Sequence, residues 1–222
     1  MNKTKNDFIY GIDEVGRGAF AGPLVAASVY VTEAQKAKLK RKKLVIRDSK
    51  TLSELQRETV YEEILDLGVI FSLQQVDIED INQHGIGWAN TTAIRALMEK
   101  NKGPTQSDGV GPLTLHYVVD GRFPMRQIEV KGIDVQCIVD ADATIFPVIL
   151  AGIVAKVTRD RMMKKLHSEF EVYKWNENKG YGTKYHLEAI RLHGISPHHR
   201  IAFLQTAFAT QFSQLRTVLH SS

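Results

Sequence analysis

The stretch Phe8-Ile9-Tyr10-Gly11-Ile12-Asp13-Glu14-Val15-Gly16-Arg17-Gly18 decides the fold. Its apolar beginning, Phe8 to Ile12, predicts a short β-strand, and two acids follow at once. Because adjacent strand residues point to opposite faces, only one of these acids can share a face with an acid of a second strand. Close carboxylates repel each other, and a cation is the usual remedy. The Gly16-Arg17-Gly18 step then offers backbone N–H groups and a guanidinium, so the stretch indicates phosphodiester chemistry.

The composition of the 222-residue chain is that of an ordinary globular protein. Hydrophobic residues make up 43% and charged residues 24% of the sequence, and a chain of this length can bury a sizeable core. The net charge of +4 is mildly basic. This charge is compatible with a polyanionic partner such as a nucleic acid, but by itself it decides nothing.

Three features favour a cytoplasmic protein. The single cysteine, Cys137, excludes a disulfide within the chain and fits a reducing compartment. The opening residues 1–7 are polar and do not resemble a signal peptide. No apolar run approaches the about 20 residues of a membrane-spanning helix, so no membrane partner is expected. The sequence is silent on oligomeric state, and a monomer is the default expectation.

Apolar and polar patterns predict alternating strands and helices. Strands are expected at residues 8–12, 24–31, 69–76, 113–119 and 133–139. Helices are expected at residues 32–43, after Ser53, from Asp77 onward, and at 145–166, 187–192 and 201–219. Loops are expected at residues 103–112 and 176–182. Ser53 with Gln56 matches a capping box. Because a hairpin of the first two strands is followed by alternating strands and helices, we expect an α/β fold with a mixed sheet flanked by helices.

Acids follow three of the predicted strands. They are Asp13 with Glu14, then Asp120, then Asp140 with Asp142. Strand ends of one sheet can converge at one edge, and four carboxylates there are untenable without metal. Carboxylate oxygens suit Mg²⁺ or Mn²⁺, whereas no nearby Cys or His cluster favours zinc. Two such ions about 3.5–4 Å apart could activate water and stabilise the leaving oxygen of a phosphodiester.

A simpler explanation exists for two of these acids when each is taken alone. Aspartate often follows a strand because it forms turns, and this reading is the better one for Asp120-Gly121 and for Asp140 in isolation. The combination favours the metal site, since three strand ends agree and the first of them carries an adjacent acidic pair.

The motifs of the chain resemble those of a known family. Gly11 to Gly18 with Ala21-Gly22-Pro23 closely resembles the opening motif of ribonuclease HII, the type 2 ribonuclease H. Further matches follow in order at Asp48-Ser49-Lys50-Thr51-Leu52, Val119-Asp120-Gly121, Ala141-Asp142-Ala143, residues 153–160, Gly180-Tyr181-Gly182-Thr183 and His199-Arg200-Ile201-Ala202-Phe203. The resemblance spans residues 8 to about 206.

This resemblance implies a ribonuclease H-like fold, with a catalytic domain at residues 1–170 and a C-terminal helical extension over the substrate groove at 171–222. It implies a hydrolase, an endonuclease that cleaves the RNA strand of RNA/DNA hybrids and ribonucleotides embedded in duplex DNA. The ends would be 3′-hydroxyl and 5′-phosphate, and the role would be ribonucleotide excision in DNA replication and repair.

The resemblance also assigns the catalytic and metal-binding acids. They would be Asp13, Glu14, Asp120 and Asp142, with Mg²⁺ or Mn²⁺ as cofactor. Counting back from Ala155-Lys156-Val157 favours Asp142 as the fourth acid, and Asp140 is its rival.

Five residues match substrate-binding positions of the family. Gly16, Arg17 and Gly18 match a loop that reads the ribose 2′-hydroxyl, which backbone groups can approach only where side chains are absent. A tight hairpin explains the same glycines. Tyr181 matches a tyrosine that packs on the sugar of the deoxynucleotide after the junction, with a core tyrosine as the alternative. Lys50 could meet a phosphate, as could the basic face of Lys156, Arg159, Lys164 and Lys165, most of which is expected to be solvated.

The chain departs from the family pattern at four places. Thr144 replaces a common Lys or Arg, Ile149–Gly152 lacks the hydroxyls of a Ser-Ala-Ala-Ser pattern, and Gly182 and Gln205 each replace a proline. None of these touches the four acids, so we expect an active enzyme whose substrate affinity is the property open to change. Four histidines lack the spacing of a zinc site and are assigned helix-end and surface roles: His186, His193, His198 and His199.

Two other functions stay open. A DNA-specific nuclease on the same fold, resembling a resolvase or transposase, would also cluster acids on strand ends. It would have no 2′-hydroxyl for the Gly16-Arg17-Gly18 loop to read. A non-catalytic hybrid-binding protein would not require like charges in one place. Cleavage of all-DNA duplexes would favour the first alternative, and tight hybrid binding without cleavage would favour the second.

Overall fold

The computed structural model describes residues 8–100 and 115–208. The loop predicted at 103–112, the start of the strand predicted at 113–119 and the predicted helix beyond Phe208 lie outside the described residues. The chain divides into two compact units. The first comprises the described parts of Met1–Val15, Val25–Gln75 and Asn90–Thr158, and the second those of Gly16–Leu24, Val76–Ala89 and Arg159–Ser222. The expected domain boundary at residue 170 stays a prediction.

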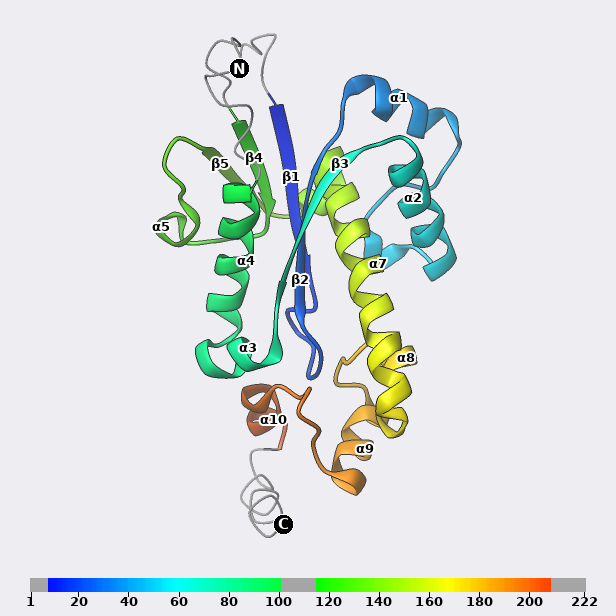
Figure 1. The fold of residues 1–222 in the computed structure, drawn as a ribbon, viewed down its shortest axis with the longest axis vertical. Helices are drawn as coiled ribbons and strands as arrows, with labels where there is room; N and C mark the ends of the chain where they lie inside the picture. Colours follow the sequence, from blue (N-terminus) through cyan, green and yellow to red (C-terminus); the bar gives the residue numbers. More distant parts are fainter. Residues whose placement is uncertain (1–7, 101–114, 209–222) are drawn as a thin grey trace. The chain divides into compact units, whose positions relative to one another are not determined.

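The first unit is built on a mixed sheet (Figure 1). Its described strands lie in the order β3-β2-β1-β4-β5. They are β1 (Phe8–Val15), β2 (Leu24–Tyr30), β3 (Ile70–Val76), β4 (Leu115–Asp120) and β5 (Asp134–Ile138). Strand β1 is antiparallel to β2 and parallel to β4, and β4 is parallel to β5. The predicted hairpin and the predicted mixed sheet are therefore confirmed.

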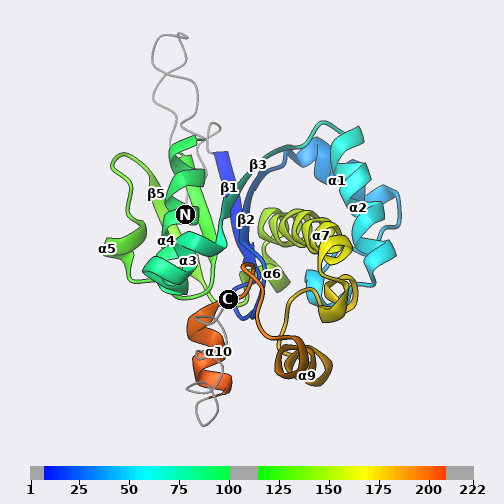
Figure 2. The same ribbon diagram turned by 60° about the horizontal axis from the view of Figure 1, so that its bottom comes forward.

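Helices cover both faces of this sheet (Figure 2). On one side lie α1 (Glu33–Arg41), α2 (Glu54–Asp66) and the beginning of α7 (Phe146–Glu169), and on the other lies α4 (Ile86–Lys100). A 3-10 turn (Ser49–Thr51) and two four-residue helices, α5 (Met125–Ile128) and α6 (Ala141–Thr144), complete the described elements of this unit. The predicted capping box of α2 is confirmed, since Ser53 and Gln56 each accept a hydrogen bond from the other's backbone N–H.

Helix α7 packs directly on β1 at Gly11. A Cβ atom at this position would lie 2.2 Å from the backbone nitrogen of Val148 and 2.3 Å from the carbonyl carbon of Pro147. Both atoms belong to main chain and cannot rotate away. The contact therefore needs a residue without a side chain, and it sets the distance between the strand and the helix.

The second unit is mainly helical. It contains α3 (Ile78–His84), the end of α7, a 3-10 turn (Glu171–Tyr173), α8 (Trp175–Asn178), α9 (Lys184–His193) and α10 (Ile201–Ala207). Its hydrophobic core includes Met163, Trp175, Ile190 and Leu204. Asn82 of α3 holds the start of α10, because its Nδ2 donates to the carbonyl of His199 and its Oδ1 accepts from the N–H of Ile201.

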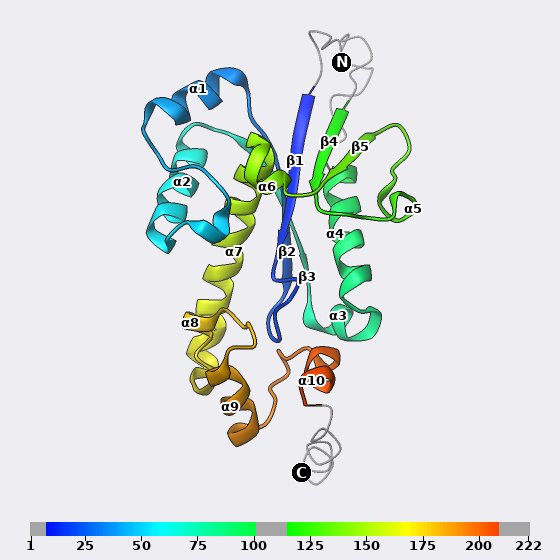
Figure 3. The ribbon, with the colours of Figure 1, turned by 180° about the vertical axis from the view of Figure 1, so that it is seen from behind.

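Several elements differ from the sequence-based expectation. Strand β1 does not end at Ile12 but continues to Val15, because Asp13 and Glu14 pair with Ala27 and Ala26 of β2. The short helix α6 lies between β5 and α7, where no helix was predicted (Figure 3). Helix α8 occupies part of the loop predicted at 176–182.

None of the helices within residues 8–100 and 115–208 is both long enough and apolar enough to cross a membrane.

Candidate active site

Two of the predicted acids lie side by side on neighbouring parallel strands. Ile12 of β1 pairs with Val119 of β4. The next residue of each strand is an aspartate, Asp13 or Asp120, so the register brings both to the same level of the sheet. Paired residues of parallel strands point to the same face, so the two carboxylates share a face. This is the convergence that the sequence predicted for the first two acidic positions.

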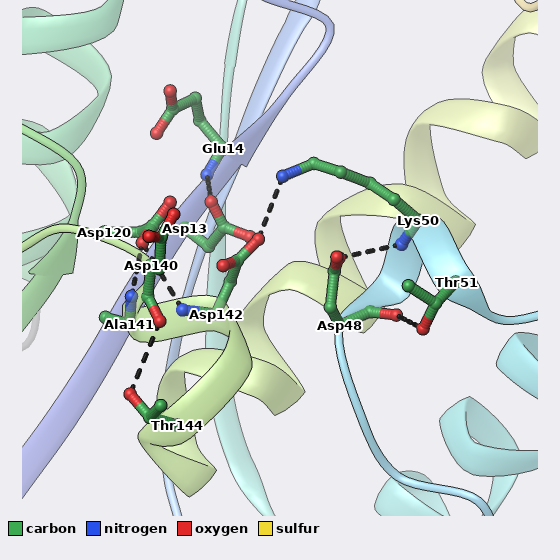
Figure 4. A network of polar contacts seen from close by, with 10 residues as sticks. All are labelled: Asp13, Glu14, Asp48, Lys50, Thr51, Asp120, Asp140, Ala141, Asp142 and Thr144. Atoms are coloured by element: carbon green, nitrogen blue, oxygen red, sulfur yellow. Dashed lines mark hydrogen bonds and ion pairs between the residues drawn. The ribbon is translucent and has the colours of Figure 1, made fainter.

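Asp120 in turn fixes the helix that carries Asp142. Its Oδ1 accepts hydrogen bonds from the backbone N–H groups of Ala141, at 2.8 Å, and Asp142, at 3.3 Å. These are the first N–H groups of α6, which have no partner inside the helix. The carboxylate of Asp120 therefore caps α6. Figure 4 shows the carboxylates of Asp13, Asp120 and Asp142 turned toward one another.

Lys50 supplies a positive charge to this cluster. Its Nζ lies 2.9 Å from Oδ2 of Asp142, which is a buried residue. Burial alone would lower the pKa of Lys50, but the hydrogen bond and the charge of Asp142 outweigh it, and the pKa is raised. Lys50 was predicted to bind substrate. In this structure it binds a predicted catalytic acid instead, so its contact with a phosphate stays a prediction.

Glu14 points to the opposite face of the sheet from Asp13. Its Oε1 accepts a hydrogen bond of 3.2 Å from Nδ2 of Asn90 in α4. Figure 4 shows its carboxylate turned away from the three aspartates. Nothing in the sequence singles out Asn90, which is almost fully buried and lies 76 residues from Glu14. The alternation argument is confirmed: only one member of the acidic pair shares a face with Asp120.

Burial and mutual repulsion raise the pKa of two of the acids. The pKa of Asp13 lies well above its usual value, first because the side chain is buried and then because Glu14, Asp120 and Asp142 are negative. The hydrogen bond from the N–H of Glu14 to Oδ1 of Asp13, at 2.7 Å, opposes this rise. The pKa of Asp120 is also raised, first by burial and then by the charge of Asp142. Its backbone hydrogen bonds and Lys50 oppose this rise.

The chemistry of this donor set fits a divalent cation. The carboxylates are hard oxygen donors. Burial, and after it the negative charge of neighbouring acids, raises the pKa of Asp13 and of Asp120, and a bound cation would relieve this repulsion. The side chains as they stand are not arranged as a metal site: no group of three or more His, Cys, Asp or Glu residues in the described ranges could hold an ion. All four are engaged elsewhere: Asp13 and Asp120 with backbone N–H groups, Glu14 with Asn90 and Asp142 with Lys50.

Asp140, the rival fourth acid, is placed differently. It is exposed, and it adopts a left-handed backbone conformation with φ of 58° at the start of α6. Its carbonyl accepts hydrogen bonds from the N–H of Ala143 and the hydroxyl of Thr144. This is the turn role that its sequence position suggested. The burial of Asp142 and its contact with Lys50 favour Asp142 as the fourth member of the cluster.

Gly152 of α7 makes room for the Asp13 carboxylate. A Cβ atom at position 152 would lie 2.4 Å from Oδ2 of Asp13. The hydroxyls that the family pattern would place along Ile149–Gly152 are absent, and at Gly152 the carboxylate uses the space that a side chain would fill. The glycine at position 152, which departs from the family pattern, therefore allows the Asp13 carboxylate to lie against α7 in the first unit.

The loop of residues 16–23, which carries the predicted substrate-binding residues Gly16, Arg17 and Gly18, belongs to the second unit. Gly16 is buried with φ of +94°, whereas Arg17 and Gly18 are exposed. A Cβ at Gly16 would lie 2.2 Å from Nε of Arg159, but a Cβ at Gly18 would meet no atom within 4 Å. The two glycines therefore differ: Gly16 is required by the fold, and the absence of a side chain at Gly18 leaves open space.

Tyr181 lies on a turn in the same unit. Its N–H donates to the carbonyl of Asn178, and its own carbonyl accepts from the N–H of Thr183 and from Nδ1 of His186, the latter at 2.9 Å. The ring is half-buried, and the guanidinium carbon of Arg159 lies 5.6 Å from its centroid. Gly182, which replaces a proline of the family pattern, packs against the ring of Phe20.

Arg159 is not part of a solvated basic face, which corrects the sequence-based expectation. Its side chain is fully buried, and its guanidinium donates three hydrogen bonds to the carbonyls of Ala21, Pro23 and Lys179. A basic residue in a helix is normally exposed, so periodicity alone predicted the wrong environment. Its acceptors come from parts of the chain 20 to 138 residues away.

The surface role assigned to the histidines is wrong for His186 and His199, which are both buried, although His186 does lie in the first turn of α9. His186 donates from Nδ1 to the carbonyl of Tyr181, so its neutral Nε2 accepts from Nε1 of Trp175, at 3.1 Å. His199 accepts at Nδ1 from the N–H of Ser196, so its Nε2 carries the proton and donates to Nε2 of His186, at 3.1 Å. This network needs both rings neutral.

Acid is expected to destabilise the protein through these two rings. Burial lowers the pKa of His186, and burial together with His186 lowers the pKa of His199 to about 3. The unfolded chain therefore binds protons first, and stability falls as the pH drops from about 6.5 toward the folded-state values, by up to about 1.4 kcal/mol per pH unit for each ring.

Urea unfolding at pH 7 and pH 4.5 measures this loss of stability. The variant His199→Gln should show a smaller loss than the wild type, and exposed His193→Gln the same loss; equal losses in all three would contradict the assignment.

Comparison with known proteins identifies the family. The family model of ribonuclease HII matches residues 10–210. The chain belongs to the ribonuclease HII family. The ribonuclease HII of Wolbachia pipientis from Culex pipiens is 41% identical over 207 residues, which cover 91% of this chain and 93% of that protein. That of Orientia tsutsugamushi strain Ikeda is 39% identical over 199 residues, covering 89% and 86%. The chain is thus an enzyme, a ribonuclease H of the hydrolase class.

Solved structures confirm the ribonuclease H-like fold. The ribonuclease HII of Archaeoglobus fulgidus, solved as a complex with PCNA, superposes with a TM-score of 0.70 at 26% identity, covering 87% of this chain and 94% of that chain. The Bst ribonuclease HIII, solved with Mn²⁺, has a TM-score of 0.69 at 18% identity, covering 98% and 71%. The second likeness shows the fold alone.

Proposed function

We propose that this ribonuclease HII family member is a metal-dependent endonuclease that cleaves the RNA strand of RNA/DNA hybrids and ribonucleotides embedded in duplex DNA. The products would carry 3′-hydroxyl and 5′-phosphate ends. The observation that carries the proposal is the convergence of three aspartates from separate elements: Asp13 of β1, Asp120 of β4 and Asp142 of α6. Burial and mutual repulsion both oppose the gathering of these charges, so their convergence favours a role that needs negative charge in one place.

The four acids Asp13, Glu14, Asp120 and Asp142 would hold Mg²⁺ or Mn²⁺, which would activate a water molecule and stabilise the leaving oxygen. Three features of the chain support this. Asp120 fixes Asp142 through the first turn of α6. Asp13 is held against the bare backbone of Gly152. Glu14 would turn toward the ions from its position beside Asn90, which donates a hydrogen bond of 3.2 Å to its Oε1.

Lys50 would exchange its partner when cations bind. Its side chain is 71% exposed, so its ion pair with Asp142 is partly screened by water and stabilises little. A divalent cation would compete for the same carboxylate. The ammonium group of Lys50 would then be available to a phosphate of the substrate, as its sequence motif predicts.

The second unit would supply the contacts that distinguish ribose from deoxyribose. The exposed Arg17-Gly18 segment offers backbone groups to a 2′-hydroxyl, and the open space at Gly18 lets a sugar approach. The half-buried ring of Tyr181 would cover the apolar face of a neighbouring deoxyribose. These two contacts make the ribonucleotide, and not the base sequence, the feature that is recognised.

A matched pair of neighbouring aspartates tests the proposal. In a DNA duplex with one ribonucleotide and Mg²⁺ or Mn²⁺, Asp142→Asn should lower the cleavage rate by at least about a thousandfold, because it removes a carboxylate from the cluster. Asp140→Asn should cleave at the wild-type rate, because Asp140 is exposed and asparagine tolerates its left-handed backbone. Loss of activity in the second variant alone would transfer the role to Asp140 and contradict the proposed site.

We also propose that the enzyme acts as a cytoplasmic monomer. The single cysteine supports a reducing compartment. Light scattering on the purified chain should give a mass near 25.0 kDa, whereas twice that mass would contradict the monomer. A fluorescent fusion that is exported from the cytoplasm would contradict the location.

A further inference from the structure

Two buried arginines hold the loop of residues 16–23 by its carbonyl groups. Arg200 donates to the carbonyls of Gly16, at 2.6 Å, and Gly22, at 2.7 and 3.0 Å, and more weakly to that of Arg17, at 3.2 Å. Arg159 donates to those of Ala21, at 2.9 Å, and Pro23, at 2.8 Å. Five of the eight carbonyls of this loop therefore point at a guanidinium.

Arg159 also reaches the second predicted substrate element. It donates to the carbonyl of Lys179, at 2.7 Å, and its guanidinium carbon lies 5.6 Å from the centre of the Tyr181 ring. The loop and the tyrosine turn are joined further by two backbone hydrogen bonds, from Phe20 and Ala21 to the carbonyl of Gly180. One side chain thus fixes both elements of the second unit that were predicted to contact substrate.

Both guanidiniums are costly to bury. Arg159 and Arg200 are fully buried, and each of their hydrogen bonds within the described residues goes to a main-chain carbonyl. Two like charges that bond no carboxylate within the described residues are costly in a protein interior. The hydrogen bonds offset this cost, because the carbonyls of the loop would otherwise lack these donors.

The carbonyl bonds have a direct effect on the exposed part of the loop. In a trans peptide the C=O and the N–H point in opposite directions. Because Arg200 holds the carbonyls of Gly16 and Arg17 inward, the N–H groups that follow them, those of Arg17 and Gly18, are directed the other way. A carbonyl that accepts from a cation is polarised, and its peptide N–H becomes a stronger donor.

We propose that Arg200 and Arg159 are positioning residues for ribose recognition. Arg200 presents and strengthens the N–H groups of Arg17 and Gly18 as donors for a 2′-hydroxyl, and Arg159 fixes Tyr181 in register with that loop. The inference rests on the proposed function, because it assigns the cause of the ribonucleotide preference. Neither arginine touches the substrate, so neither is a catalytic residue.

The test compares binding of two duplexes that differ at one sugar. The protein carries Asp142→Asn to prevent cleavage, and dissociation constants are measured in Mg²⁺ for a DNA duplex with one ribonucleotide and for the all-DNA duplex. Added Arg200→Lys keeps the charge but replaces the planar fork of five N–H donors by a compact ammonium, which cannot reproduce the guanidinium's geometry toward the three carbonyls. We expect it to reduce the ratio of the two constants by about fivefold or more, while all-DNA affinity stays within about twofold.

The control is Arg191→Lys, which changes an exposed arginine of the same unit that pairs with Glu188. It should leave both constants unchanged. A merely structural role of Arg200 would weaken binding of both duplexes equally, so an unchanged ratio in folded Arg200→Lys would overturn the inference. If the protein with intact Arg200 already fails to discriminate, the proposed function fails instead, and the two failures are therefore distinguishable.

A second measurement needs no variant of a buried residue. Backbone amide resonances of Arg17 and Gly18 should shift when the ribonucleotide duplex binds and shift less with the all-DNA duplex. Equal shifts with both duplexes would overturn the inference even if Arg200→Lys did not fold.

Discussion

Replacing Asp13 with asparagine is expected to reduce cleavage of a ribonucleotide-containing duplex by at least about a thousandfold, or about 4 kcal/mol in the barrier. Asp13 is 4% exposed, and three other acids act on its charge. Asparagine keeps the size of the side chain and an oxygen that can accept the N–H of Glu14. The fold should therefore persist while the negative charge is lost.

The same substitution is expected to stabilise the protein when divalent ions are absent. The pKa of Asp13 is raised in the folded state, so the folded protein binds this proton more tightly than the unfolded chain does. Ionised Asp13 therefore opposes folding at pH 7, and this penalty develops as the pH rises above about 4, the usual value of an aspartate. Metal-free Asp13→Asn should have a higher melting temperature than the wild type at pH 7 and the same one below about pH 4.

Divalent ions should reverse that order. Mn²⁺ should raise the melting temperature of the wild type, because it binds the folded state only, and should raise that of Asp13→Asn much less. Exposed Asp134→Asn, which alters an acid bonded to His116, serves as the control and should respond like the wild type. An Asp13→Asn protein that is less stable without metal, or that cleaves at the wild-type rate, would contradict this account of the cluster.

Gly11→Ala is expected to be the most destabilising small substitution in the first unit. The added Cβ would lie 2.2 Å from the backbone nitrogen of Val148, so β1 and α7 would have to separate. Such overpacking costs about 2 kcal/mol or more, which lowers the melting temperature by about 4–8 °C in a protein of this size. Because Asp13 lies on the same strand, cleavage activity should fall together with the melting temperature.

Gly87→Ala is the matched control for this prediction. Gly87 lies in the first turn of α4, and a Cβ there would meet no atom within 4 Å. Alanine favours the helix over glycine by up to about 1 kcal/mol, so this variant should be as stable as the wild type or slightly more so. Thermal unfolding of the two variants in parallel distinguishes a steric effect at Gly11 from a general effect of losing a glycine.

The positions of the acids could be predicted because they depend on strand order and alternation. Asp13 and Asp120 each follow an apolar run, and a sheet places such ends together. The same alternation predicted that Glu14 lies on the opposite face of the sheet from Asp13. The extension of β1 through both acids could not be predicted, because pairing with Ala26 and Ala27 of β2 overrides the low strand propensity of aspartate and glutamate.

The partners of the buried polar side chains could not be predicted. Arg200 bonds the carbonyl of Gly16 from 184 residues away, and no local pattern records such a contact. The sequence shows Arg159 only as one basic residue among several in a helix, and His186 only as a histidine near a helix start. Their environments are set by tertiary packing in the second unit, which composition and periodicity do not encode.

Helix α6 illustrates how the site itself shapes local structure. Four residues are too few to form a stable helix from propensity alone. The carboxylate of Asp120 accepts the N–H groups of Ala141 and Asp142 and so provides the missing cap. Asp142 was assigned from its motif, and the helix that presents it depends on an acid of a different strand.

Cleavage of a DNA duplex with a single ribonucleotide, with the product ends mapped, tests the central claim most directly. The account predicts that the purified chain cuts this duplex in Mg²⁺ or Mn²⁺, that it leaves 3′-hydroxyl and 5′-phosphate ends, and that a chelator stops the reaction. An all-DNA duplex of the same sequence should stay intact. Undiminished cleavage in the presence of chelator, or equal cleavage of both duplexes, would contradict the claim that these carboxylates hold metal ions to cut at ribose.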